Sequence, residues 1–133
     1  MLDEPLWLTR LAVEAIHTDL IRAHGGEVGL RDEGALESAL ARARHRWCYD
    51  PSSDLVSLAS CHGYALTRSH PFVDGNKRIA FVAMNVFLIL NGLEIETTEE
   101  DVVDVMYRLA AGAIDEGALA EWLRRVTVPA PPG

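Results

Sequence analysis

The chain has 133 residues, of which 49% are hydrophobic and 24% charged, a composition typical of one globular domain with a packed core. Its formal net charge of -8 argues against a nucleic-acid partner, because phosphate binding needs a basic surface. Two cysteines, Cys48 and Cys61, are too few for a zinc cluster, and we expect both to be reduced and buried.

The longest apolar run, Ile79 to Leu90, falls short of the roughly 20 residues that a membrane span needs, so it is predicted to be a core element. No secretion signal is recognisable, and we expect a cytoplasmic protein without a membrane partner. The half that follows Arg78 carries three Lys/Arg against nine Asp/Glu. Such an acidic surface favours a basic partner segment.

Three helices are predicted in the first half of the chain. The first begins near Thr9 as N-cap and ends at Gly25, and the second begins after Asp32. The third runs to Ser69, because Pro71 prevents the helix from continuing. The apolar face expected for the first helix consists of Leu11, Ala15, Ile16, Leu20 and Ile21.

Three more helices are predicted in the second half. One runs from Asn76 to Asn91 through the apolar run and should be buried on most sides. A short extended piece, Leu93 to Glu96, leads to a helix that opens at residues 97–100, and a last helix spans Asp115 to Arg125.

The predicted fold class is therefore all-α, with about six helices packed around a central buried helix. Residues 127–133 contain three prolines and are expected to be a disordered tail without a structural role, which leaves a single domain of residues 1–126. His17 and His24, on the first helix, are expected at the surface or at its cap.

Functional residue types are concentrated in the segment His70 to Arg78, which joins the third predicted helix to the fourth. Lys77 and Arg78 lie at the predicted N-terminus of a helix, where the helix dipole already supplies positive charge. Two cations are unfavourable there, and an anion bound between them would offset the repulsion. Gly75 lets the backbone approach a ligand, Asn76 can cap the helix, and the free N–H groups of the first turn add donors.

The same segment holds residues suited to phosphoryl transfer. Asp74 is the type of ligand that Mg²⁺ takes together with phosphate oxygens and water. His70 is the natural general base for a hydroxyl nucleophile at neutral pH. Phosphoryl transfer needs little more than this set, because it depends mainly on positioning and charge neutralisation. The same residues have an alternative interpretation without function. Asp74-Gly75-Asn76 would then be a plain turn followed by a helix cap, and Lys77 and Arg78 would be solvated surface cations.

Two other interpretations are weaker. His62, His70 and Asp74 could be metal ligands, but no third ligand completes a regular pattern around any pair, and His62 is expected on the helix near the loop. The basic run Arg42 to Trp47 could bind RNA, yet most such runs are solvated helix ends, and the net charge opposes this role.

The segment His70-Pro71-Phe72-Val73-Asp74-Gly75-Asn76-Lys77-Arg78 resembles the signature loop of the Fic/Doc superfamily. It resembles the death-on-curing (Doc) branch in particular, which carries Asn-Lys-Arg where adenylylating Fic enzymes have Gly-Asn-Gly-Arg and a second Arg three residues later. Here Lys77 replaces the second Gly, and Phe81 stands at the position of that second Arg. The resemblance extends from about Leu8 to Arg125.

The resemblance implies an all-helical Fic fold and the toxin of a type II toxin–antitoxin module, with a Phd-like antitoxin as partner. In the Doc branch the implied reaction is transfer of the ATP γ-phosphoryl group to a threonine of elongation factor Tu, which blocks translation. Transfer of AMP to a protein hydroxyl, as in Fic enzymes, and a binding protein without catalysis are the alternatives. The antitoxin is expected to order on binding in a groove near the site.

Site roles also follow from the resemblance. His70 is implied as the catalytic base, Asp74 as the Mg²⁺ ligand, and Gly75, Asn76, Lys77 and Arg78 as the cradle for the ATP phosphates, with Phe72 anchoring the loop in the core. Arg31, Asp32 and Glu37 belong to the resembling N-terminal segment, and the sequence gives them no role beyond capping and surface pairing.

Overall fold

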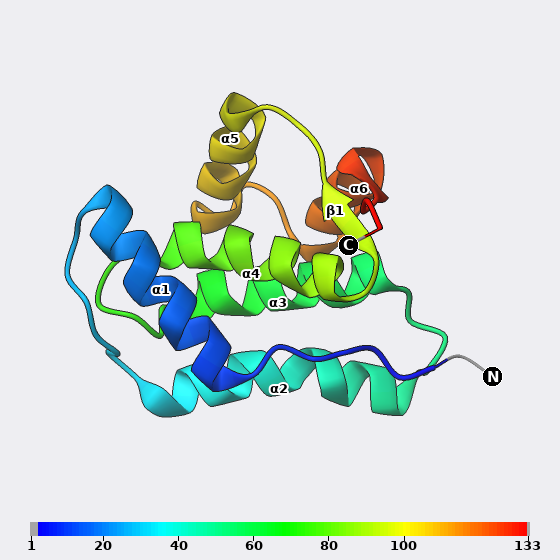
Figure 1. Cartoon of the computed structure of the whole chain (residues 1–133), viewed down its shortest axis with the longest axis horizontal. Coiled ribbons are helices and arrows are strands. Elements are labelled where there is room, and N and C mark those ends of the chain that lie inside the picture. Colours follow the sequence, from blue (N-terminus) through cyan, green and yellow to red (C-terminus); the bar gives the residue numbers. More distant parts are fainter. Residues whose placement is uncertain (1–2, 133) are drawn as a thin grey trace.

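The structure is a computed structural model that describes residues 3–132, and within that range the chain folds into six helices and one small sheet (Figure 1). The helices are α1 (Arg10–His24), α2 (Glu33–Tyr49), α3 (Leu55–Ser69), α4 (Asn76–Leu90), α5 (Glu99–Ala110) and α6 (Glu116–Val126). The strands are β1 (Leu93–Ile95) and β2 (Thr127–Pro129), which pair antiparallel. The prediction of an all-α protein with about six helices is confirmed.

Five of the six helices begin at a side-chain cap. In each, the side-chain oxygen of the N-cap residue accepts a hydrogen bond from a backbone N–H of the first turn, which satisfies a donor that has no partner inside the helix. The five N-cap residues are Thr9, Asp32, Asp54, Thr98 and Asp115. Helix α4 is the exception, because its N-cap is Gly75.

Helices α3 and α4 lie side by side at the centre of the molecule, with α2 below them, α1 at the left and α5 and α6 above (Figure 1). Both central helices are extensively buried, so a pair of helices occupies the position predicted for one. They approach closely at Gly63, where a Cβ atom would collide with the Met84 side chain. No helix in residues 3–132 combines the length and apolarity needed to cross a membrane.

The buried face of α1 agrees with the predicted one only in part: Ile16, Leu20 and Ile21 lie against the core as predicted. Val13, His17 and Ile21 are buried, whereas Leu11 is 79% exposed. These three buried positions are four residues apart, so they form a narrow stripe along one side of the helix. The prediction that His17 lies at the surface is wrong, because a histidine within such a stripe faces the protein interior.

The prediction of a disordered tail is wrong for Thr127–Pro129. These residues form β2, with Val128 paired opposite Glu94 of β1. Two flanking hydrogen bonds extend the pairing: Glu96 N donates to Val126 O (2.7 Å), and Ala130 N donates to Gly92 O (2.9 Å). The short extended piece after α4 supplies these partners, so a segment rich in proline is held at the edge of a sheet.

The two cysteines have different environments. Cys61 is buried on α3, and burial raises the pKa of its thiol, whereas Cys48 near the end of α2 is exposed. The expectation that both are buried is therefore wrong for Cys48. Both are free thiols.

Candidate active site

The candidate site is the loop between the end of α3 and the start of α4. His70 is the C-cap of α3 and has left-handed backbone angles (φ 47°, ψ 56°). Among residues 3–132 it is the only non-glycine residue with a positive φ. This conformation costs an L-residue about 1–2 kcal/mol, so other contacts must hold it. The His70 side chain is exposed and therefore accessible to a substrate.

Asn76 shapes the loop from inside. Its Oδ1 accepts a hydrogen bond from Phe72 N (3.0 Å), and its Nδ2 donates to Phe72 O (2.9 Å). The side chain is 9% exposed, and Nδ2 also lies 3.4 Å from His70 Nδ1. The prediction that Asn76 caps α4 is wrong, because both ends of its amide are used to close the loop.

The start of α4 brings together several groups that would attract an anion. Gly75, at φ 73°, is the N-cap and has no side chain that could bond the N–H groups of the first turn. Lys77 and Arg78 lie in that turn, and both are exposed. Donors without an intrahelical partner, the positive end of the helix dipole and two cations therefore meet at one helix end.

Asp74 lies on the outer side of the loop, and its backbone and side chain are held from two directions. Its carbonyl oxygen accepts a hydrogen bond from Nε2 of the buried His17 (2.7 Å). The ring of His17 also stacks on Phe72, with centroids 3.8 Å apart and planes at 11°. Phe72 is 2% exposed, so this stack fixes the loop to the core.

The Asp74 carboxylate makes two backbone contacts. Its Oδ1 accepts from Gly75 N (2.9 Å), and its Oδ2 accepts from Glu27 N (3.3 Å). Gly26 makes the second contact possible, since a Cβ atom there would lie 2.6 Å from Asp74 Oδ2. The carboxylate is exposed and keeps free lone pairs, which suits a hard cation such as Mg²⁺.

The segment between α1 and α2 runs along the loop and supports it. Val73 N donates to Gly29 O (3.0 Å), and Leu30 forms an isolated antiparallel bridge with Phe72. The N–H groups of Arg31 and Asp32 both donate to Pro71 O, at 2.8 and 3.0 Å. This segment therefore acts as a backbone frame for the loop.

Sequence reasoning missed His17 and Arg31, and the structure gives Asp32 and Glu37 defined contacts. The Arg31 side chain reaches the last turn of α3, donating from Nε to His70 O (2.6 Å) and from Nη2 to Ser69 O (2.8 Å). Asp32 caps α2, and Glu37 pairs with Arg10 Nη1 (2.6 Å). The four-residue spacing of Val13, His17 and Ile21 was the one signal in the sequence that could have identified His17.

His62 lies in the core and does not belong to the site. It packs against the rings of Trp7 and Phe87, with centroids 6.5 and 5.0 Å away. Neither ring nitrogen has a hydrogen-bond partner within the described chain, and burial lowers the pKa of His62 to about 4. Within residues 3–132, no three His, Cys, Asp or Glu side chains form a group that could hold a metal ion.

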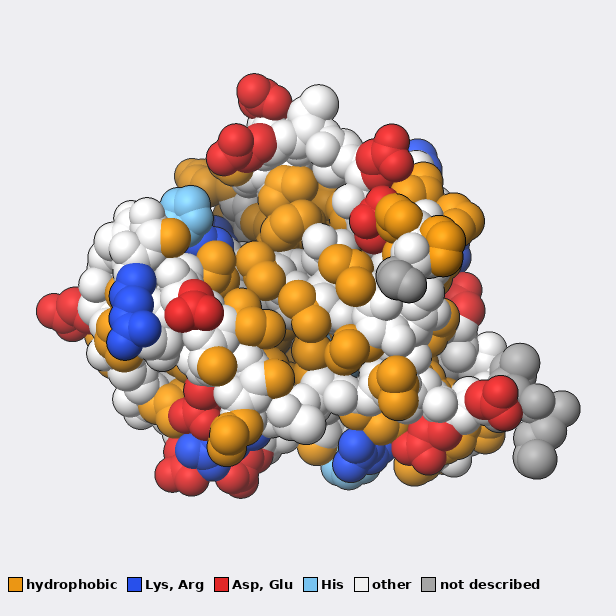
Figure 2. Space-filling model, in the orientation of Figure 1, with side chains coloured by type: hydrophobic (Ala, Val, Ile, Leu, Met, Phe, Trp, Pro, Cys, Tyr) orange, Lys and Arg blue, Asp and Glu red, His pale blue; other side chains and the backbone are white. Residues whose placement is uncertain are grey.

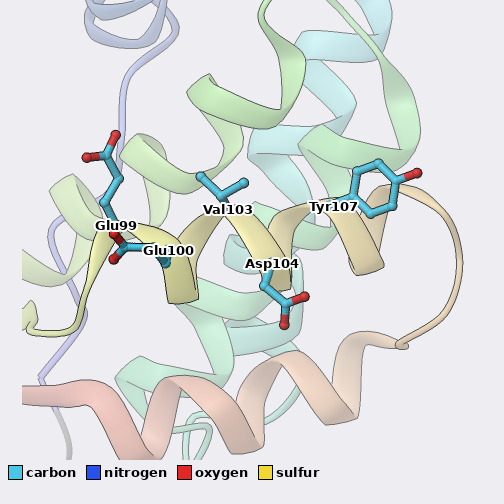
Figure 3. A pocket seen from close by; sticks show the side chains of 5 residues that line it. All are labelled: Glu99, Glu100, Val103, Asp104 and Tyr107. Carbon is cyan, nitrogen blue, oxygen red and sulfur yellow. The ribbon is translucent and has the colours of Figure 1, made fainter.

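A groove of about 770 Å³ opens next to the loop between α4 and α5, with the end of α1 at its side. Figure 2 shows apolar side chains in this hollow. Lys77 and Arg78 line it near the loop, Phe81 and Met106 contribute apolar surface, and Lys77 Nζ lies 5.9 Å from the centre of the Tyr107 ring. The outer side of α5 is acidic, with Glu99, Glu100 and Asp104 beside Val103 and Tyr107 (Figure 3).

The fold and the site together define an all-helical protein in which one loop carries a histidine and a carboxylate and leads into a helix whose first turn contains two cations. The family model described as the Fic/DOC family matches residues 7–88, and the chain belongs to that family. It is 32% identical over 112 residues to "Protein kinase doc" of Escherichia phage P1, covering 84% of this chain and 88% of that protein. It is also 34% identical over 101 residues to "Toxin Doc" of Mycolicibacterium smegmatis (strain ATCC 700084 / mc(2)155), covering 74% and 78%.

The resemblance to the Doc branch that the loop indicated is thus confirmed by both relatives. The family match includes the whole candidate loop and most of α4.

Proposed function

We propose that this protein is the toxin of a type II toxin–antitoxin module and acts by transferring the γ-phosphoryl group of ATP to a threonine of elongation factor Tu. The observation that carries the proposal is the loop itself, where an exposed His70 stands next to a helix start with free N–H donors, Lys77 and Arg78. The names of the two relatives, one a kinase and both called Doc, agree with it.

In this reaction His70 accepts the proton of the target hydroxyl while the hydroxyl oxygen attacks the γ-phosphorus. A new O–P bond forms, the bond from the γ-phosphorus to the bridging oxygen breaks, and ADP leaves with the electron pair. Arg78 holds phosphate oxygens in a two-pronged contact and Lys77 adds a point charge, so the charge on the leaving phosphate is neutralised. The first-turn N–H groups of α4 supply further donors.

Asp74 would hold the Mg²⁺ ion, since it is an exposed carboxylate directly before the start of α4. When bound, Mg²⁺ neutralises phosphate charge and orients the transferred group. The ion would complete its coordination with phosphate oxygens and water. Two residues support Asp74 in this role. His17 fixes its carbonyl group through a hydrogen bond, and Gly26, which has no side chain, leaves room for its carboxylate.

Phosphoryl transfer is favoured over AMP transfer by residue 81. Phe81 occupies the position where adenylylating relatives carry a second arginine, and it is half-buried in the wall of the groove. The apolar ring cannot bind a phosphate at that point, which removes a ligand for the binding mode of AMP transfer, in which the α-phosphate lies at the reacting position.

The experiment is mass spectrometry of elongation factor Tu, and of a whole cell extract, after incubation with this protein, Mg²⁺ and ATP, beside a His70→Ala control. A gain of one phosphoryl mass on one threonine, absent from the control, supports the kinase. A gain of one AMP mass would mean that it is an adenylyltransferase, and an unchanged proteome would favour a binding protein without catalysis.

The proposed partner is a Phd-like antitoxin, a segment of which orders in the groove between α4 and α5. A segment seated there would cover Lys77 and Arg78 and bury the apolar wall. The acidic outer side of α5 favours basic residues on such a segment (Figure 3).

Val103→Arg tests this placement. Val103 is 62% exposed and lines the groove, so the substitution should leave the fold and the transfer reaction intact and abolish neutralisation when toxin and antitoxin are co-expressed. Leu11→Arg, at an exposed position outside the groove, is the control and should be neutralised normally. Normal neutralisation of Val103→Arg would place the antitoxin elsewhere.

A further inference from the structure

We propose that Arg31 is a positioning residue that holds His70 in the geometry it needs as the base. This inference rests on the proposed function of His70. It concerns a residue on the segment between α1 and α2, far in sequence from the loop whose conformation it controls.

The local sequence does not favour the observed backbone of His70. Because Pro71 follows, the right-handed helical conformation is disfavoured at His70 and an extended one is preferred. The structure instead has left-handed angles, the single such case at a non-glycine residue in the described part of the chain. A long-range contact must therefore outweigh the local preference.

Arg31 makes that contact. Its Nε donates to His70 O at 2.6 Å and its Nη2 to Ser69 O at 2.8 Å, so one planar guanidinium bridges two successive carbonyls. These carbonyls belong to the end of α3, where the last C=O groups of a helix lack partners and the dipole favours a cation. The fixed fork of a guanidinium suits two adjacent acceptors, which an ammonium group cannot bond in the same way.

The other contacts of the frame do not include the His70 backbone. The N–H groups of Arg31 and Asp32 bond Pro71 O, and Val73 N bonds Gly29 O, so they hold the loop from Pro71 onward. Asn76 Nδ2 lies 3.4 Å from the His70 ring, a weak contact at best. Without the Arg31 side chain, His70 would relax toward the extended conformation, and its imidazole would move away from the nucleophile.

Arg31 is also separate from the proposed phosphate ligands, which lie at the start of α4. Its removal should therefore reduce the rate of transfer and leave nucleotide binding unchanged. A misplacement of about 1 Å is enough to cost roughly a hundredfold in rate, so we expect kcat to fall by about tenfold to a hundredfold in Arg31→Ala.

The kinetic test measures kcat and KM for ATP in wild type, Arg31→Ala, Arg31→Lys and Arg125→Ala. We expect the KM for ATP to stay within about twofold in all four, kcat to fall in Arg31→Ala, and Arg31→Lys to recover part of the loss, because one ammonium can bond one of the two carbonyls. Arg125, an exposed cation in the last turn of α6, is the matched charge control and should behave as wild type. A wild-type kcat in Arg31→Ala, or a loss that appears only in the KM for ATP, would overturn the inference.

A second measurement separates this inference from the proposed reaction. In NMR spectra, a positive φ gives a strong nuclear Overhauser effect between the amide proton and the Hα of the same residue. We expect this signal at His70 in wild type and Arg125→Ala and its loss in Arg31→Ala. If wild type transfers no group to any target, the proposed function fails while the NMR result still decides whether Arg31 controls His70. Retention of the signal in Arg31→Ala would contradict the inference.

Discussion

The loop from His70 to Asn76 and the core around His62 differ in whether their buried polar side chains have hydrogen-bond partners. At the loop, two buried side chains are hydrogen-bonded to its backbone: His17, which comes from α1, bonds Asp74 O, and Asn76 bonds Phe72. In the core, His62 is enclosed by aromatic rings with no hydrogen-bond partner for either nitrogen among the described residues. A buried polar side chain that is hydrogen-bonded to the backbone fixes the backbone conformation. One without a partner only fills space in the core, and its desolvation lowers the free energy of unfolding.

The comparison leads to different expectations for substitutions in the two regions. Changes in the loop should affect transfer activity more than stability, because the loop positions reacting groups. Changes at His62 should affect stability and its pH dependence and leave activity unaltered.

The largest expected effect is that of His70→Ala on activity. Loss of a general base lowers kcat by about 10³-fold, and the free energy of unfolding should stay within about 0.5 kcal/mol because the side chain is exposed. Phosphoryl-transfer assays and urea unfolding check both parts. His45→Ala, at an exposed position of α2, should match wild type in both. Full activity of His70→Ala would show that the loop is not the catalytic site.

The next effect is the pH dependence of stability caused by His62. Burial lowers its pKa from 6.5 to about 4, so between these values the unfolded chain binds a proton that the folded protein does not. The free energy of unfolding contributed by this residue is therefore complete above pH 6.5 and falls by about 3 kcal/mol as the pH drops toward 4.

His62→Leu should remove this part of the pH dependence and raise the free energy of unfolding at pH 7 by about 1 kcal/mol, since no buried nitrogen is left unbonded. Urea unfolding at pH 7 and pH 4.5 measures it, with His45→Ala as the control that keeps the wild-type pH dependence. A His62→Leu variant whose pH dependence equals that of wild type would mean that His62 is solvated or bonded in solution.

The smallest expected effect is the difference between alanine substitutions at two neighbouring glycines. Gly25 and Gly26 both have positive φ, but a Cβ at Gly25 meets no atom within 4 Å, whereas one at Gly26 would lie 2.6 Å from Asp74 Oδ2. Gly25→Ala should cost about 1 kcal/mol of stability from backbone strain alone. Gly26→Ala should cost about 1 kcal/mol more and also slow transfer, because the Asp74 side chain must move. Equal transfer rates in the two variants would show that the Asp74 position does not matter.

The helix boundaries were predictable because they depend on neighbouring residues. The caps Thr9 and Asp32 and the break at Pro71 act within a few positions, and the structure has each of them. The loop was also recognisable as a candidate site, since its residue types are contiguous. The predicted face of α1 is wrong in part because it rests on apolar residues alone, whereas the polar His17 continues the buried stripe of Val13 and Ile21.

The sequence by itself determined the all-helical fold, the extent of the helices and the chemical groups available on the loop, because these follow from local hydrogen bonding and composition. The tertiary structure alone decided how those groups are held. Arg31 bonds His70 O across 39 positions, His17 bonds Asp74 O across 57, and Thr127–Pro129 pairs with a strand more than 30 residues earlier. The physical reason is that such contacts exist only after packing has brought distant segments together, so no local pattern of residues encodes them.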